Sequence, residues 1–282
     1  MKRIVATILG FMLFTGIIFW TYINVSESSS YLSYEGVPAD TYFYRTQNDA
    51  DCILIKNGDA AILIDTGEKA DSEGIIRFLE DRGIQTVDFL ILTHYDKDHT
   101  GGALDIMDNI EIKSVIKPYQ QVKTPDVEII DRKLEDLSIP VIYPLHTRTF
   151  SVGGMNMTVY PPLEKRYSDG NNYSIVTMVS HGKVRMLFAG DALYKRINEL
   201  LSINWPEDIR LLKVPHHGRQ GENSAEFIRT IDPDFMVITS DKADEAVIEA
   251  GSKVGSEIFF SRNKNLHFAS DGKLLKMMEE SE

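Results

Sequence analysis

The sequence predicts an α/β domain of mixed β-sheets with helices packed outside them, over residues 35–282. Two observations predict it: short apolar runs rich in branched and aromatic residues recur along the chain, and segments with helical spacing of apolar residues separate several of them. In addition, the region contains no repeat with a period of about 20–50 residues and no low-complexity tract. The sequence therefore predicts one folded domain here.

The first expected elements are a hairpin and a helix. Residues 52–55 and 60–64 form apolar strands around a tight turn, and the helix at 72–82 has an apolar face that ends at Gly83. The run at 89–92 has the continuous apolar character of a strand buried on both faces. The same criteria predict further strands at 42–44, 114–116, 141–143, 155–160, 174–180, 184–189, 211–214 and 235–239, and helices at 125–137 and 224–230.

The N-terminus differs in composition from this domain. Lys2 and Arg3 precede residues 4–26, which carry no charge and are long enough to cross a bilayer core of about 30 Å. We expect residues 1–26 to be an uncleaved signal anchor that crosses the cell membrane once, and residues 27–34 to be a linker. The basic end stays in the cytoplasm, so the domain is expected to be extracytoplasmic. The alternative is a signal peptide that is removed on secretion.

Charge and cysteine content narrow the function classes. Lys plus Arg number 30 and Asp plus Glu number 42, which gives a net charge of −12. This charge argues against a broad basic surface for double-stranded nucleic acid, but leaves a small anionic or single-stranded substrate possible because bound cations supply local positive charge. The single cysteine, Cys52, excludes an intrachain disulfide and is expected to be a buried core residue and not a nucleophile.

Residues able to bind a metal ion follow the apolar run at 89–92. Four of them occur within six positions: His94, Asp96, Asp98 and His99. Imidazole nitrogens and carboxylate oxygens are the ligands expected for Zn²⁺ or Mn²⁺. His94 and Asp96 are two residues apart, so in an extended segment their side chains leave the same side. Taken alone, the segment could equally be a solvated polar loop.

Two further strand ends carry similar residues. Asp191 follows the expected strand at 184–189, and His216 and His217 follow the strand at 211–214. Each would usually be a structural or turn residue on its own. Three strand ends with ligand-type side chains in one chain favour a metal centre.

These motifs resemble those of the metallo-β-lactamase superfamily. Its signature is His-x-His-x-Asp-His, and here Asp96 stands in the place of the second histidine. The closer resemblance is to the ComEC-type branch, whose hydrolase domain is attached to the DNA-uptake channel protein of competent bacteria. It rests on the Asp-rich first motif, Asp65-Thr66-Gly67, the Asn-Asn-x-Ser element of Asn171, Asn172 and Ser174, Gly190-Asp191, and Lys213-Val214-Pro215-His216-His217-Gly218. It covers about residues 40–275 and implies an αββα sandwich.

The resemblance implies two divalent metal ions, Zn²⁺ or Mn²⁺, bridged by Asp191. His94 and Asp96 would bind the first ion, and Asp98, His99 and His217 the second. Which of His216 and His217 is the ligand stays open; His216 is assigned to contact with substrate or leaving group. Because Asp96 replaces a histidine, and Asn171 to Ser174 stand where the family has another, we expect weaker binding and more tolerance of Mn²⁺ at the first position.

The remaining assignments concern residues around the ions. Asp65 is expected to orient the ligands, with a turn-forming Asp as the alternative. Asn171, Asn172 and Ser174 are expected either to support the metal ligands or to lie near the substrate. Lys213 is expected either to contact an anionic substrate or to face solvent.

The main functional hypothesis is hydrolysis of a phosphodiester by a metal-bound hydroxide, with Asp98 orienting the water and His216 protonating the leaving oxygen. DNA or another extracytoplasmic phosphodiester, such as a teichoic-acid decoration, would be the substrate. The first alternative is a lactamase, lactonase or other carboxylic ester hydrolase of the same fold. The second is a non-catalytic binding protein with a degenerate metal site.

Overall fold

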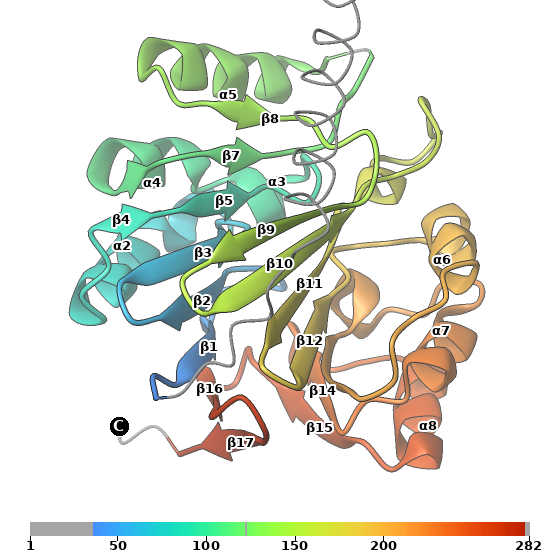
Figure 1. The fold of residues 1–282 in the computed structure, drawn as a ribbon. Coiled ribbons are helices and arrows are strands. Elements are labelled where there is room, and N and C mark those ends of the chain that lie inside the picture. Colours follow the sequence, from blue (N-terminus) through green and yellow to red (C-terminus); the bar gives the residue numbers. More distant parts are fainter. Residues whose placement is uncertain (1–35, 122, 280–282) are drawn as a thin grey trace, which may run out of the picture. The chain divides into compact units, whose positions relative to one another are not determined.

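A computed structural model of the chain describes residues 36–121 and 123–279 (Figure 1). The signal anchor and linker expected at residues 1–34 lie outside this part. Within the part that is described, no helix has the length and apolarity that crossing a bilayer requires.

Two large β-sheets form the centre of the domain (Figure 1). The first has the strand order β17 (Leu275–Met278), β16 (Leu266–Ser270), β1 (Ala39–Phe43), β2 (Ile53–Asn57), β3 (Ala60–Ile64), β5 (Phe89–Ile91), β7 (Val115–Ile116) and β8 (Val141–Ile142). The second has the order β15 (Glu257–Phe260), β14 (Phe235–Ile238), β13 (Ile209–Lys213), β12 (Val184–Phe188), β11 (Val176–His181), β10 (Met155–Tyr160) and β9 (Arg148–Val152). A short sheet pairs β4 (Thr86–Val87) with β6 (Glu111–Ile112).

Helices cover the outer face of each sheet (Figure 1). The first sheet is covered by α2 (Ser72–Asp81), α4 (Ala103–Asn109) and α5 (Pro125–Asp136), and the second by α6 (Tyr194–Leu201), α7 (Ser224–Ile231) and α8 (Glu245–Val254). One apolar core lies between the sheets, and two more lie between each sheet and its helices. These layers confirm the αββα sandwich that the resemblance implies.

Alternation along the strands produces these three cores. In β2, Ile53 and Ile55 enter the core between the sheets, whereas Leu54 packs against the outer helices. In β12, Met186 enters the central core and Leu187 packs against α6 to α8. Since successive side chains of a strand point to opposite faces, a strand covered on both faces must be apolar throughout.

Several elements were not predicted from the sequence pattern. In α6 a buried arginine, Arg196, interrupts the apolar face, and α8 buries mainly small residues such as Ala250 and Gly251. Helix α4 has only seven residues, which is too short for a clear helical period. The edge strands β9, β15 and β17 are partly exposed and lack the strongly apolar runs of the central strands.

The parallel parts of both sheets bring the predicted motifs to one edge. Asp65 directly follows β3, and β5 leads into His94, while β12 leads to Asp191 and β13 to the histidine pair. Carboxyl ends of parallel neighbouring strands meet at the same sheet edge, where α/β proteins usually bind ligands.

Glycines allow the first motif to lie against the loop after β3. A Cβ on Gly102 would lie 2.4 Å from the carbonyl oxygen of Thr66, and a Cβ on Gly101 would lie 2.4 Å from that of Lys97. These two positions therefore require glycine for a steric reason. The short helix α3 (Lys97–Thr100) is thereby packed next to Asp65.

Candidate metal centre

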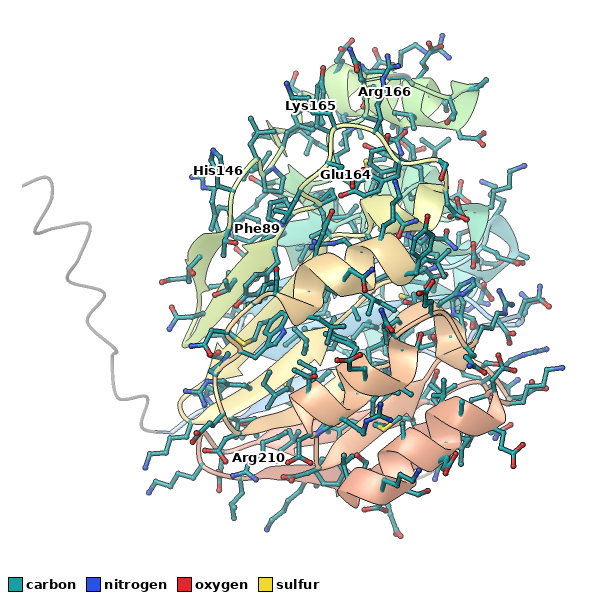
Figure 2. All side chains as sticks on the ribbon, turned by 90° about the vertical axis from the view of Figure 1, so that its right-hand side faces the viewer. Phe89, His146, Glu164, Lys165, Arg166 and Arg210 are labelled. Atoms are coloured by element: carbon teal, nitrogen blue, oxygen red, sulfur yellow. The ribbon has the colours of Figure 1, made fainter. Side chains whose placement is uncertain are left out.

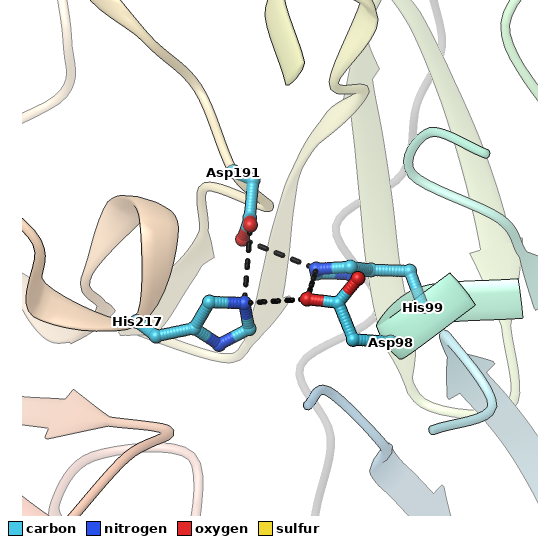
Figure 3. Close-up of side chains that lie close together, drawn as sticks. All are labelled: Asp98, His99, Asp191 and His217. Carbon is cyan, nitrogen blue, oxygen red and sulfur yellow. Dashed lines mark hydrogen bonds and ion pairs between the residues drawn. The ribbon is translucent and has the colours of Figure 1, made fainter. Parts of the chain in front are cut away.

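Four side chains from three distant segments converge at this edge (Figure 3). Asp98 and His99 belong to α3, Asp191 follows β12, and His217 lies in η3 (Pro215–Gly218) after β13. Asp191 Oδ1 lies 3.2 Å from His99 Nε2, and Asp191 Oδ2 lies 3.0 Å from His217 Nε2. Asp98 Oδ2 lies 3.1 Å from His217 Nε2 and 3.6 Å from His99 Nε2.

These distances fit ligands that share one cation. Ligand atoms at about 2.0–2.2 Å from a tetrahedral Zn²⁺ lie roughly 3.3–3.6 Å apart. The buried Nε2 atom of His99 has no hydrogen-bond partner within the described residues, although a carboxylate oxygen is near it. Two imidazoles and two carboxylates around an unpaired ring nitrogen are a donor set for a divalent cation.

His94 and Asp96 lie beside this cluster, not within it. His94 is buried and its ring centroid lies 4.1 Å from that of His99. Its Nε2 atom also has no hydrogen-bond partner among residues 36–121 and 123–279, and lies 3.7 Å from Asp96 Oδ2. The side chain of Asp96 is 53% exposed. This pair fits a second cation position that is open to solvent, next to a closed one.

Asp65 fixes the ring of His99. Its Oδ2 atom lies 2.7 Å from His99 Nδ1 and accepts a hydrogen bond from the Thr93 hydroxyl at 2.7 Å; its Oδ1 atom accepts one from the Thr93 backbone N–H at 2.8 Å. Thr93 Oγ1 lies in turn 3.1 Å from His94 Nδ1. A carboxylate on the far nitrogen of a ligating histidine sets the ring orientation, which is the role expected for Asp65.

Asp51 was missed by the sequence reasoning. It is fully buried, forms an ion pair with Lys213, and its Oδ1 atom lies 3.4 Å from His217 Nδ1. Its backbone N–H donates to the Asp98 carbonyl at 3.1 Å, and its carbonyl accepts from Gly67 N–H at 2.8 Å. The available signal was an acidic residue directly before a buried strand, and several acidic residues nearby obscure it.

Lys213 corrects an expectation, because it faces neither solvent nor the open side of the site. The side chain is fully buried, with Nζ donating to the Gly190 carbonyl at 3.0 Å and lying 3.4 Å from Asp191 Oδ1. The charge is tolerated there because Asp51 supplies a carboxylate from a segment 162 positions earlier in the chain. Sequence spacing does not reveal that pairing.

The charged side chains of the centre shift one another's pKa values. Burial alone would favour neutral groups, but His217, His99 and Lys213 together hold the pKa of Asp191 well below its usual range. Burial likewise opposes the charge on His217, yet Asp191 and neighbouring carboxylates raise its pKa to about 10. Without metal, the carboxylates therefore retain protons on the histidines, and a bound divalent cation would replace those protons.

The histidine pair sits in strained backbone. His216 and His217 have φ values of 50° and 52°, in the left-handed region that is uncommon for residues other than glycine. The His216 backbone N–H donates to the Gly190 carbonyl at 3.2 Å, which links this turn to Asp191. The structure brings His217 into the cluster, whereas His216 is half-buried and its Nδ1 has no hydrogen-bond partner in the described part.

Ser174 and Asn172 support the loop that carries Asp191. Ser174 Oγ is 3.0 Å from the Asp191 backbone nitrogen, which donates to it. Asn172 Oδ1 accepts from the Arg196 backbone N–H at 3.0 Å, and the buried Arg196 guanidinium donates to the Ser174 carbonyl at 3.0 Å. Asn171 is half-buried, with no hydrogen-bond partner for its Oδ1 in the described residues. Arg196 was not predicted, and no motif marks it.

The cysteine and the three remaining histidines lie away from the centre. Cys52 is buried in the core under α2, as predicted. His146 is exposed (Figure 2), His267 pairs with Asp40 at 2.8 Å, and His181 lies 2.9 Å from Ser270 Oγ.

A shallow cavity of about 360 Å³ opens over the exposed side of the centre. It is lined by Tyr95, Asp96, Lys97, Asp98, Gln120, Thr124, Asp126 and Gly170. A substrate can therefore reach Asp96 and Asp98 without movement of the buried residues.

Comparison with known proteins agrees with this geometry. The model of the metallo-beta-lactamase superfamily matches residues 45–239, more than two thirds of the chain. The chain belongs to the metallo-beta-lactamase superfamily. The described residues include a cluster of Asp and His side chains suited to a divalent metal.

Within the superfamily, the chain is similar to ComEC-type competence proteins. It is 27% identical over 176 residues to ComE operon protein 3 of Bacillus subtilis, covering 62% of this chain and 22% of that protein. It is 30% identical over 201 residues to Recombination protein 2 of Haemophilus influenzae, covering 67% and 22%. The chain thus spans about a fifth of the length of these curated relatives.

A solved structure supports the superfamily fold. The metallo-beta-lactamase fold protein YhfI from Bacillus subtilis aligns with a TM-score of 0.57 at 12% identity, covering 82% of this chain and 100% of that one. At this identity the similarity concerns the fold alone.

Proposed function

We propose that the chain hydrolyses phosphodiester bonds with two divalent cations, Zn²⁺ or Mn²⁺. His94 and Asp96 would hold the first cation, and Asp98, His99 and His217 the second, with Asp191 between them. The observation that carries this proposal is the pairing of a closed, carboxylate-rich cluster with an open position at Asp96. We expect weaker binding at the open position, since its ligands are fewer and one is exposed.

Different residues of the chain have different roles in the proposed reaction. The bound cations would polarise the scissile ester and lower the pKa of a water molecule. Asp65 and the Thr239 hydroxyl, which lies 3.0 Å from His217 Nδ1, keep the His99 and His217 rings facing the centre. Asp98, partly exposed at the cavity, can orient the attacking water, and the half-buried His216 imidazole is available to contact the leaving oxygen.

An anionic substrate suits this arrangement. The cations would bring positive charge to an otherwise acidic chain of net charge −12, so attraction would be local to the centre. Relatives whose names refer to competence and recombination support a nucleic-acid phosphodiester, and the acidic surface favours a single strand over a duplex. We place this activity on the extracytoplasmic side of the cell membrane, with residues 1–26 as the anchor.

A substrate panel tests the proposal. The full-length protein, purified in mild detergent and supplied with Mn²⁺ or Zn²⁺, is expected to hydrolyse bis-p-nitrophenyl phosphate and a single-stranded oligonucleotide. Activity should disappear with chelator and return with metal. Nitrocefin and a homoserine lactone should be turned over slowly or not at all.

Two results would contradict it. Turnover of the lactam or lactone without phosphodiester cleavage would replace the proposal with a carboxylic ester hydrolase. Absence of bound transition metal in elemental analysis, together with absence of turnover, would favour a binding protein.

A further inference from the structure

A second cavity lies beside the one that opens over the metal centre. Its volume is about 210 Å³, and its walls include Tyr95, Lys117, Tyr119, Lys123 and Tyr143. It shares Tyr95 and Gln120 with the cavity over Asp96 and Asp98. The two cavities are therefore neighbours along one face.

The order of the strands places this second cavity beside the metal centre. Strands β5, β7 and β8 are parallel neighbours, and their carboxyl ends carry Tyr95, Lys117 and Tyr143 in that order. Neighbouring strands lie about 4.8 Å apart, so the end of β8 is roughly 10 Å from the strand that delivers His94. A chain-like substrate lying across the strand ends would contact both cavities.

The cavity presents aromatic rings to solvent. Tyr119 is 51% exposed and Tyr143 is 39% exposed, and their ring centroids lie 6.0 Å apart in an edge-to-face arrangement. Exposed aromatic rings beside a catalytic cavity are a common feature of sites that bind planar rings, since a ring gains stacking energy there.

Positive charge lies directly behind the rings. The Lys117 side chain is buried, with Nζ 5.3 Å from the Tyr143 ring centroid and 5.4 Å from that of Tyr95. Lys117 pairs with Asp131, and Lys123 Nζ lies 2.6 Å from the other oxygen of the same carboxylate. Two ammonium groups share the Asp131 carboxylate, and Glu135 also acts on Lys123. Because the Lys123 side chain is 49% exposed, its ammonium is the one that an anion can reach.

A hydrogen bond joins two loops beside the cavities. Arg166, labelled in Figure 2, donates its Nε–H to Gln121 Oε1 at 2.9 Å. The loop after β10 is thereby joined to the segment that carries Tyr119. Gln121 directly follows Gln120, which lines both cavities.

We propose that this cavity binds the base of the nucleotide next to the scissile phosphodiester of a single-stranded nucleic acid. The base lies between Tyr119 and Tyr143, whose rings are 85° apart, so it stacks on the face of one ring and meets the other edge-to-face. Lys123 contacts the phosphate that follows the base. This inference rests on the proposed phosphodiesterase activity and specifies its substrate. The volume lies below the roughly 300–1,000 Å³ of sites for drug-sized ligands, which fits a single planar ring. A polyol phosphate would leave the tyrosines without a stacking partner.

Oligonucleotide binding tests the stacking residues. Fluorescence anisotropy of a labelled single-stranded oligodeoxynucleotide is measured with the full-length protein in chelator, so that cleavage does not interfere. Tyr119→Ala and Tyr143→Ala are each expected to weaken binding roughly 5- to 150-fold, whereas Tyr119→Phe and Tyr143→Phe keep the ring and should bind within about 3-fold of wild type. An oligonucleotide with abasic residues should bind the wild type as weakly as the Ala variants bind the normal one.

Salt dependence tests the lysine with a matched control. Lys123→Gln is expected to reduce the slope of log affinity against log salt by about 0.7, the value for one phosphate contact on a single strand. Lys113→Gln should leave the slope unchanged. Lys113 is also an exposed lysine, and its Nζ lies 2.8 Å from Asp88 Oδ1. It precedes β7, so it lies at the amino ends of the strands, whereas the two cavities lie at their carboxyl ends.

Failure of this inference is separable from failure of the proposed function. Equal binding of wild type and both Ala variants, or equal binding of normal and abasic strands, would overturn the base site even if bis-p-nitrophenyl phosphate is hydrolysed. Absence of any oligonucleotide binding would overturn it too. Base-dependent binding without phosphodiester turnover would keep the site and reject the activity.

Discussion

Asp51→Ala is expected to lower the free energy of unfolding of the metal-free protein by about 3–5 kcal/mol. The substitution leaves the ammonium of Lys213 fully buried without its ion-pair partner, and also removes a carboxylate 3.4 Å from His217 Nδ1. Asp191 Oδ1 lies 3.4 Å from Lys213 Nζ, so without Asp51 it compensates only part of the buried charge of Lys213. Denaturant unfolding in chelator measures the effect without a contribution from bound metal.

A double variant separates the buried charge from loss of packing. Asp51→Ala combined with Lys213→Met removes both charges, so it should be more stable than Asp51→Ala alone. Glu249→Ala is the control for an exposed pair: its partner is Lys253, both side chains are about 60% exposed, and a change below about 1 kcal/mol is expected. If the double variant lost the sum of the two single effects, the ion pair would have no structural role.

Asp191→Asn is expected to reduce metal affinity and phosphodiester turnover by more than about 100-fold. Loss of a group that only orients a ligand typically costs about 10–100-fold, and Asp191 faces the two histidines directly. The amide has nearly the same shape but carries no charge and offers a single oxygen. Elemental analysis after dialysis and the rate on bis-p-nitrophenyl phosphate measure the two effects.

Asp208→Asn provides the matched control for that variant. Asp208 precedes β13 at the end opposite Lys213, is exposed, and has a φ of 63°, a conformation that asparagine tolerates well. Its metal content and rate should equal those of the wild type. Retention of both cations and of full turnover by Asp191→Asn would remove Asp191 from the centre.

The local pattern of the sequence was enough to predict the central strands. Strands β3 and β10 have the predicted bounds. β3 is an apolar run, β10 alternates buried and half-buried residues, and both follow turn residues. The edge strands β9, β15 and β17 were not predicted, since partial exposure weakens their pattern, and α6 was not predicted because the buried Arg196 interrupts its apolar face. The layer order followed from the family resemblance and not from periodicity.

The metal ligands were predicted from ligand-type residues in the segments after apolar strands, together with the family resemblance. The structure gathers His94, Asp98, His99, Asp191 and His217 at one edge. Asp51 and Lys213 lie 162 positions apart, and each resembles an ordinary polar residue until the fold pairs them. The choice between His216 and His217 also needed the three-dimensional structure, in which the His217 Nε2 atom lies 3.0 Å from Asp191 Oδ2.

Anomalous diffraction from crystals of the full-length protein soaked in Zn²⁺ or Mn²⁺ tests the central claim most directly. We expect one peak within about 2.0–2.3 Å of ligand atoms from Asp98, His99, Asp191 and His217, and a second, weaker peak beside His94 Nε2 and Asp96. Peaks confined to the protein surface at saturating metal, with none between those four side chains, would contradict it.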